Sequence, residues 1–160
     1  MKAVLGIGTN MGDRADNINS AVESLSLVPG ITVLRISDIY ETEPWGFTDQ
    51  PDFYNNVVEI ETELTPNALL GVCLGIEAAM GRVRVFKNGP RIIDIDLLVY
   101  EGAKSDTEEL RLPHPRISER AFVLVPLKDL YDDLNVLGIS YKKFYENMSN
   151  TDIANKVEKS

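Results

Sequence analysis

The chain has 160 residues, of which 44% are hydrophobic and 26% charged, and its formal net charge at pH 7 is −9. This length suits one domain with a real core, and this composition excludes disordered and fibrous proteins. The acidic balance argues against nucleic-acid binding, and the single cysteine excludes an internal disulfide and a cysteine-rich zinc site.

No apolar stretch is long enough to predict a signal sequence or a membrane span. We therefore expect a cytoplasmic, monomeric protein without a membrane partner. One domain is expected over residues 1–160, with its core over about residues 2–131 and a peripheral C-terminal tail.

The N-terminal third of the chain predicts two strands separated by a helix. Residues 3–9 are mostly apolar and end among glycines, which is typical of a short buried strand. Residues 16–27 place apolar side chains at helical spacing, and residues 31–39 are rich in β-branched side chains. Two prolines and a glycine make residues 43–51 a predicted loop.

Alternation predicts the next strand, over residues 58–64. Every second side chain is apolar or threonine and the others are glutamates, a pattern typical of an antiparallel strand with one face in water. The predicted inward set is Val58, Ile60, Thr62 and Leu64, and the predicted outward set is Glu59, Glu61 and Glu63.

A second helix and a last strand follow. Thr65 and Pro66 have the features of a helix N-cap and a first helical residue, and Gly81 follows as the stop. Residues 92–100 predict a strongly apolar strand that contains two aspartates, and a short helix is expected from Lys128. The last twenty residues are polar, and we expect them to be peripheral.

The predicted order is therefore strand, helix, strand, strand, helix, strand. This is the order of the ferredoxin-like α+β fold, an antiparallel sheet with two helices on one face. The C-terminal segment can cover part of the other face, which would make three layers of helix, sheet and helix.

Asp94 and Asp96 stand two positions apart in the apolar strand, so they project from the same face. One interpretation is a pair on a solvent-facing strand. The other is a platform for a divalent metal, because hard oxygen ligands at short spacing suit Mg²⁺. The spacing alone leaves both interpretations open.

A basic segment over residues 82–91 leads directly into this strand and contains no acid. Such a run is often only a solvated loop, but with a carboxylate-bound Mg²⁺ its cations could hold a polyphosphate. No P-loop sequence is present, and the glycines at positions 6 and 8 lack the third glycine of a dinucleotide fingerprint. The cations are Arg82, Arg84, Lys87 and Arg91.

Three further residue types bear on a ligand site. Trp45 and Phe53 suit either core anchors or a stacking surface for a flat ligand, and the Asn55 amide could bind a heterocycle edge. His114, the only histidine, lies between two prolines and suits a ligand contact and a structural role equally. Cys73 is expected to be a core thiol without chemistry.

Together these motifs resemble those of the 6-hydroxymethyl-7,8-dihydropterin pyrophosphokinase family of folate biosynthesis, over about residues 2–131. The strongest part of the resemblance is the run from Lys87 to Leu98, which includes Asn88-Gly89-Pro90-Arg91. The supporting matches are Gly6-Ile7-Gly8-Thr9-Asn10, Thr42, Asp49-Gln50-Pro51-Asp52-Phe53, Asn55, Glu77, Gly81-Arg82-Val83-Arg84, Pro113-His114-Pro115 and Arg120-Ala121-Phe122.

The resemblance implies an enzyme that transfers pyrophosphate from ATP to the pterin hydroxymethyl oxygen and releases AMP. It also implies two Mg²⁺ ions on Asp94 and Asp96 as metal ligands, and Arg82, Arg91, Asp94 and Asp96 as catalytic residues. The ATP-binding set implied is Glu77, Arg82, Arg84, Lys87, Arg91, Leu97, Arg111, His114 and Arg120. The pterin-binding set implied is Gly8, Asn10, Thr42, Trp45, Phe53, Asn55, Asp94 and Phe122.

Two other readings compete with this one. Another Mg²⁺-dependent nucleotide-using transferase with a D-x-D metal site would keep the aspartates and arginines but would not need Phe53, Asn55 and Phe122. A non-catalytic ferredoxin-like module that binds a ligand or partner would need neither aspartate. The effect on catalysis of Lys87-Asn88, where many family members have Arg-Trp in a loop one residue longer, stays open.

Overall fold

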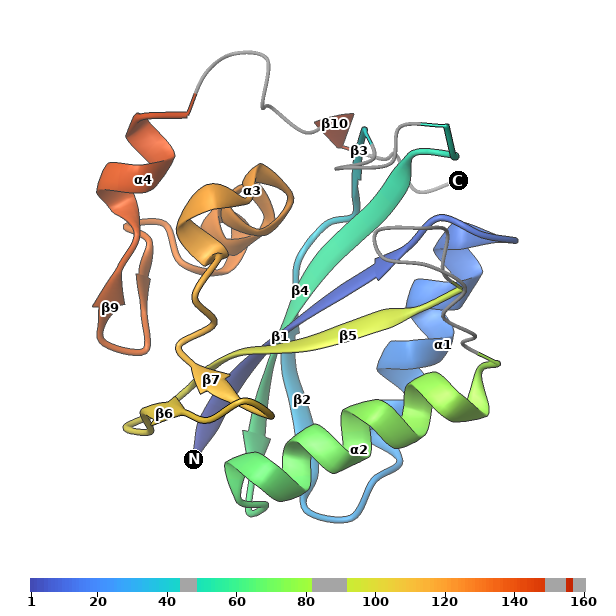
Figure 1. The fold of residues 1–160 in the computed structure, drawn as a ribbon, viewed down its shortest axis with the longest axis horizontal. Helices are drawn as coiled ribbons and strands as arrows, with labels where there is room; N and C mark the ends of the chain where they lie inside the picture. The colour runs from blue at the N-terminus through green and yellow to red at the C-terminus, as the bar shows by residue number, and fades with distance from the viewer. Residues whose placement is uncertain (44–48, 82–91, 149–154, 157–160) are drawn as a thin grey trace.

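The computed structural model describes residues 1–43, 49–81, 92–148 and 155–156, and a six-stranded sheet lies at its centre (Figure 1). Every pairing in this sheet is antiparallel, in the order β10-β3-β4-β1-β5, and β2 also pairs with β4. The predicted ferredoxin-like arrangement is therefore confirmed. The strands are β1 (Lys2–Thr9), β2 (Ile31–Ile36), β3 (Tyr40–Thr42), β4 (Phe53–Thr62), β5 (Asp94–Tyr100) and β10 (Asn155–Lys156).

Helices α1 (Arg14–Ser26) and α2 (Pro66–Ala79) cover one face of the sheet (Figure 1). The Asp13 carboxylate accepts a hydrogen bond from the Asp16 N–H at 3.1 Å and caps α1. The Thr65 hydroxyl accepts one from the Ala68 N–H at 3.2 Å and caps α2, as predicted. Both caps satisfy N–H groups that the first helical turn leaves without partners.

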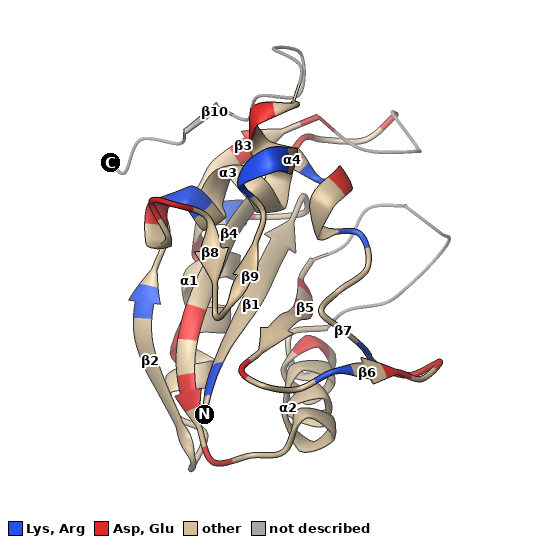
Figure 2. Cartoon of the chain, turned by 90° about the vertical axis from the view of Figure 1, so that its left-hand side faces the viewer, with Lys and Arg blue, Asp and Glu red and all other residues tan. Residues whose placement is uncertain are grey.

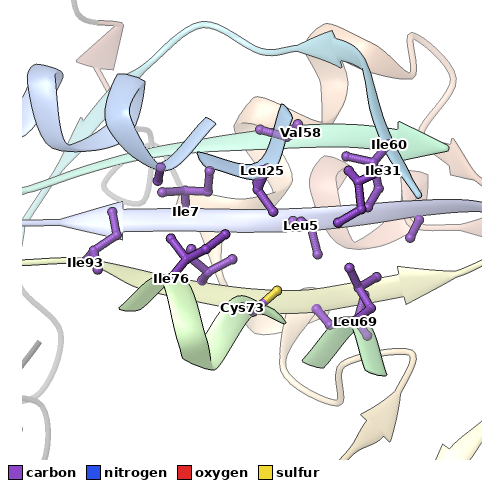
Figure 3. Packing of buried hydrophobic residues seen from close by; sticks show 14 of the residues in the cluster. Leu5, Ile7, Leu25, Ile31, Val58, Ile60, Leu69, Cys73, Ile76 and Ile93 are labelled. Carbon is purple, nitrogen blue, oxygen red and sulfur yellow. The ribbon is translucent and has the colours of Figure 1, made fainter. Parts of the chain in front are cut away.

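The larger hydrophobic core lies between these two helices and the sheet (Figure 3). Leu5 and Ile7 of β1 meet Leu25 of α1 and Leu69 of α2, and all four side chains are buried. Cys73 also lies in this core, as predicted, and burial raises the pKa of its thiol to about 12. The thiol therefore stays protonated and inert at neutral pH.

The other face of the sheet is covered by α3 (Ala121–Leu130), so the expectation of a helix starting at Lys128 is wrong. Pro126 lies inside α3, and a proline at that point normally predicts a helix boundary because it lacks an N–H donor. The helix continues because Val123, Leu124, Leu127 and Leu130 bury one apolar side against Val4, Val57 and Leu98.

Strand β4 is buried on both faces over most of its length, which corrects the predicted solvent-facing position of Glu59. Glu61 and Glu63 are exposed, as predicted, but Glu59 is only 3% exposed because α3 covers it. Glu59 accepts hydrogen bonds from Arg35 and from the hydroxyl of Tyr131, just after α3. We call Arg35, Glu59 and Tyr131 the Glu59 cluster.

The C-terminal part of the chain adds to the α3 layer, which completes three layers of helix, sheet and helix (Figure 1). Leu134, Val136 and Tyr141 are buried in the α3-side core, although they lie beyond the expected core range. The small elements here and before α3 are β6 (Ser105–Asp106), β7 (Arg111–Leu112), the 3-10 helix η1 (Ile117–Glu119), β8 (Asn135–Val136), β9 (Ile139–Ser140) and α4 (Lys142–Glu146).

Charges of both signs are interspersed along the outer elements on this side of the molecule (Figure 2). Both signs occur on α3 and α4 and around the β6–β7 hairpin (Figure 2). Among the described residues, none of the helices is both long and apolar enough to span a membrane.

Candidate active site

A cavity of about 480 Å³ lies between the sheet, the start of α3 and the segment that precedes α3. This volume is in the range of small-molecule sites. Its lining residues are Gly6, Ile7, Gly8, Thr42, Glu43, Phe53, Asn55, Asn56, Asp94, Asp96, Leu98, His114, Arg116, Arg120, Phe122 and Val123.

The floor of the cavity is strand β1, at Gly6 and Gly8. Gly8 lies opposite Asn55 of β4 on one side and opposite Asp94 of β5 on the other. A Cβ atom on Gly8 would lie 2.7 Å from Oδ1 of Asn55, which is closer than such atoms can approach. Glycine at this position therefore leaves room for the Asn55 amide beside the cavity.

Asp94 and Asp96 both line the cavity from β5, as their spacing predicts. Between them, the Ile95 N–H donates a 3.0 Å hydrogen bond to Oε2 of Glu77, a buried carboxylate of α2. Glu77 thus holds the backbone that carries both aspartates. An ion pair of 3.7 Å joins Oδ2 of Asp96 to Nη1 of Arg120.

The two aspartates fit a magnesium site. The described part of the chain holds no group of three or more His, Cys, Asp or Glu side chains placed to share a metal. Mg²⁺ does not need such a group, because it binds through one or two carboxylates and takes its other ligands from water and phosphate oxygens. Asp94 and Asp96 supply that donor set at the cavity wall.

Six of the residues expected to bind a pterin line the cavity: Gly8, Thr42, Phe53, Asn55, Asp94 and Phe122. The Asn55 amide donates a 3.1 Å hydrogen bond to the Thr42 hydroxyl, since β3 and β4 pair side by side here. Phe53 comes from β4 and Phe122 from α3, so the cavity has aromatic side chains from two layers.

His114 lines the same cavity and is neutral at pH 7. Burial, with a further lowering by the positive charges of Arg120 and Arg116 and an opposing effect of Asp94, brings the pKa of its imidazole down to about 4. The backbone N–H of His114 donates to the Leu98 carbonyl at 2.7 Å, and the ring nitrogen Nδ1 accepts from the backbone N–H of Arg116 at 3.2 Å. The other ring nitrogen, Nε2, therefore carries the proton.

Four expected site residues do not line this cavity. Leu97 is 3% exposed and packs in the core on the α1–α2 side, and Glu77 lies behind β5. Arg111 is exposed and pairs with Asp106 at 3.7 Å. Asn10 is buried nearby and donates to Oε1 of Gln50 and to the Pro51 carbonyl.

Five expected site residues lie outside the described residues: Trp45, Arg82, Arg84, Lys87 and Arg91. Conversely, the cavity wall includes Arg116, which the motifs did not single out. The sequence marks Arg116 only by its position, two residues after His114 and four residues before Arg120.

A family model described as 7,8-dihydro-6-hydroxymethylpterin-pyrophosphokinase (HPPK) matches residues 4–132 of this chain. This range contains every residue that lines the cavity.

Named relatives agree with this match. A 2-amino-4-hydroxy-6-hydroxymethyldihydropteridine pyrophosphokinase of Methylorubrum extorquens is 56% identical over 137 residues, which cover 86% of this chain and 87% of the relative. The protein of the same name from Bacillus subtilis is 43% identical over 128 residues, 80% of this chain and 77% of the relative. The folic acid synthesis protein fol1 of Schizosaccharomyces pombe is 45% identical over 132 residues, 82% of this chain but 18% of that longer protein.

Solved structures share the fold. A crystal structure described as HPPK-DHPS in complex with substrates has a TM-score of 0.67 and 16% identity, covering 91% of this chain and 42% of that chain. Plasmodium falciparum HPPK-DHPS A437G with STZ-DHP has a TM-score of 0.66 and 19% identity, with 91% and 45% covered. The chain thus spans less than half the length of these two structures. Because its sequence matches both the family model and full-length relatives, this chain belongs to the 7,8-dihydro-6-hydroxymethylpterin-pyrophosphokinase family.

Proposed function

We propose that this chain transfers pyrophosphate from ATP to the hydroxymethyl oxygen of 6-hydroxymethyl-7,8-dihydropterin and releases AMP, as a step of folate biosynthesis. Membership of the pyrophosphokinase family supports this activity. The observation that carries the proposal is that one cavity combines the paired carboxylates of Asp94 and Asp96 with the aromatic and amide groups of Phe53, Phe122 and Asn55.

The aromatic and amide groups suit a pterin. Phe53 of the sheet and Phe122 of α3 present aromatic surfaces from two adjacent layers of the fold, between which a flat ring can stack. The Asn55 amide, held by Thr42, offers both a donor and an acceptor to the amide edge of such a ring. A site built to bind these edges discriminates steeply against ligands that lack them.

The other end of the cavity suits the triphosphate of ATP. We assign Arg120 and the ring Nε2–H of neutral His114 to binding of ATP. We assign Asp94 and Asp96 to binding of two Mg²⁺ ions. When bound, these ions would neutralise charge on the phosphate oxygens. By the family resemblance, Arg82 and Arg91 act on the transferring phosphates, and Arg84 and Lys87 help to bind ATP.

In the proposed reaction, the pterin hydroxymethyl oxygen forms a bond to the β-phosphorus of ATP while the bond from that phosphorus to AMP breaks. The hydroxyl proton leaves to solvent, and the electron pair of the broken bond stays on AMP. This chain's residues then contribute mainly orientation and charge compensation, which is usual for phosphoryl transfer. Another D-x-D transferase would have no need of the Phe53, Asn55 and Phe122 group, so the geometry does not favour it.

We propose that the enzyme acts as a monomer. We also propose that it acts in the cytoplasm, on ATP and the free pterin. Light scattering at working concentration tests the first point, and fractionation of cells that express the chain tests the second.

The activity is tested by incubating the full chain with Mg²⁺, ATP and 6-hydroxymethyl-7,8-dihydropterin while AMP and ADP are measured separately. We expect AMP that depends on the pterin, no ADP, and loss of AMP formation when a chelator removes Mg²⁺. Controls lacking the pterin or the protein set the background. A folded protein that binds ATP but forms no AMP, or forms ADP without the pterin, would contradict the proposal.

A further inference from the structure

Helix α3 connects the cavity to a polar cluster at the opposite end of the helix. Phe122 and Val123, in its first turn, line the cavity, and Arg120 precedes it as the N-cap residue. Tyr131 follows the last turn. Tyr131 lies nine positions after Phe122, so the helix spans about 14 Å between the two ends.

The Glu59 cluster ties the end of α3 to the sheet. The Arg35 guanidinium donates to Glu59 through Nε at 3.1 Å and Nη2 at 2.8 Å, so the pair is bidentate. Its third nitrogen, Nη1, donates to the Leu130 carbonyl, the last of the helix. The Tyr131 hydroxyl donates to Oε2 of Glu59, the oxygen that also accepts from Nη2 of Arg35. The Arg35 guanidinium carbon lies 4.9 Å from the centre of the Tyr131 ring.

A second contact fixes the same end of α3 to the strand beside Asn55. The Tyr40 hydroxyl lies 2.8 Å from each carboxylate oxygen of Asp129, and the Asp38 N–H donates to Asp129 at 3.1 Å. Tyr40 is paired with Asn55, and Thr42 of the same strand accepts the Asn55 hydrogen bond. The end of α3, the helix that carries Phe122, is therefore also joined to β3, the strand that pairs beside Asn55.

Stability alone gives little reason for a carboxylate at position 59. Burial disfavours the charged form of Glu59, but hydrogen bonds from Arg35 and Tyr131 and the positive charges of Arg35 and Lys2 hold its pKa below the usual value. Replacing a buried carboxylate and its buried partner with apolar side chains of similar volume is often neutral or stabilising, and Arg35, whose side chain is 45% exposed, would stay solvated. What such a pair does supply is a defined geometry, here between β2, β4 and the end of α3.

We propose that the Glu59 cluster positions α3 so that Phe122 stands at stacking distance from the bound pterin, which makes Glu59 and Tyr131 positioning residues for pterin binding. This inference rests on the function proposed above. Arg35, Glu59 and Tyr131 do not line the cavity, so they act on the pterin only through the helix.

The test compares Tyr131→Phe, which removes only the hydroxyl, with the double variant Glu59→Leu/Tyr131→Phe, which makes the buried part of the cluster apolar. We expect both to raise the KM and the Kd for the pterin about five- to tenfold, while kcat changes less than about twofold. The Kd is measured by calorimetry with the pterin and the α,β-methylene analogue of ATP, whose bridge cannot be cleaved. The double variant should match or exceed the melting temperature of Tyr131→Phe, which separates positioning from stability.

Two variants serve as matched controls. Glu61→Gln changes the same residue type two positions further along the same face of β4, where the side chain is exposed. Tyr141→Phe changes a buried tyrosine of the same core that lies outside the cluster. Both should keep the pterin Kd of the unaltered protein within about twofold.

Unchanged pterin KM and Kd in Tyr131→Phe and in the double variant, with AMP formation intact in the unaltered chain, would overturn the positioning role and leave the proposed function standing. A loss of kcat and melting temperature without any change in pterin affinity would also overturn it, because that pattern belongs to a purely structural role. If the unaltered chain neither binds the pterin nor forms AMP, both proposals fail together.

Discussion

The two faces of the central sheet are built from the same strands but by different chemistry. In β1, Leu5 points into the core against α1 and α2, whereas Gly6 and Gly8 line the cavity on the other side. In β5, Ile95 belongs to that core and Asp96 to the cavity. Alternation along a strand thus lets one segment serve stability on one face and ligand binding on the other.

The difference extends to the helices that cover the faces. The α1–α2 face is a closed apolar core (Figure 3), whereas the α3 face divides into an apolar part, the Glu59 cluster and the cavity. Substitutions on the first face should therefore change the free energy of unfolding and leave the chemistry intact. Substitutions at the cavity should lower the activity and leave the free energy of unfolding nearly unchanged.

The largest effect is expected at the carboxylates. Asp96→Asn should lower AMP formation roughly 10³-fold, because a carboxylate assigned to the metal and the phosphates is lost. The melting temperature should change little, since relief of the repulsion between two neighbouring anions is offset by loss of the ion pair between Asp96 and Arg120. Turnover and thermal unfolding measured on one preparation check both points, with exposed Asp106→Asn as control. Turnover within tenfold of the unaltered chain would refute the assignment.

The core on the α1–α2 face is tested by Leu25→Ala. Leu25 is fully buried, so the cavity left behind should reduce the free energy of unfolding by about 3 kcal/mol. The kcat/KM for the pterin, per folded molecule, should not change. Leu27→Ala at the end of the same helix is the control, because Leu27 is 76% exposed and its loss should cost less than about 0.5 kcal/mol. A core variant with altered pterin KM would show that the two faces are not independent.

Stacking in the cavity is tested by Phe122→Ala. Loss of one aromatic surface should raise the pterin KM about five- to twentyfold, which corresponds to about 1–2 kcal/mol. The KM for ATP should change less. Steady-state kinetics with each substrate varied in turn measure the split, and Phe144→Ala on exposed α4 is the matched control. Equal changes in both KM values would argue against a specific role in pterin binding.

The smallest effect is the pH response of His114 in the ligand-free protein. Its pKa in the folded state is about 4, below the usual value of 6.5, so the unfolded chain binds the proton more readily. Stability should therefore fall as the pH drops from about 6.5 towards 4, and His114→Asn should weaken this trend. Because the chain has one histidine, its imidazole proton resonances report the midpoint directly by NMR. A midpoint near 6.5 would refute burial as the controlling influence.

Local rules were enough to predict much of this architecture from the sequence. The Thr65-Pro66 start of α2 and the order of strands and helices follow from capping, periodicity and turn chemistry between near neighbours. The shared face of Asp94 and Asp96 follows from the twofold period of a strand, and the cavity lies on that face. Each of these features depends on residues only a few positions apart.

Only the tertiary structure decided which of those faces is covered, and by what. Glu59 has the sequence pattern of a surface residue, yet it is buried because α3 covers it. Its partner Tyr131, just after α3, lies 72 positions further along the chain. Leu97 lies in the core instead of the cavity, and Arg116 lies in the cavity wall without any motif to mark it. A sequence period tells which side chains share a face, but burial depends on distant elements that pack against that face, and no local pattern specifies them.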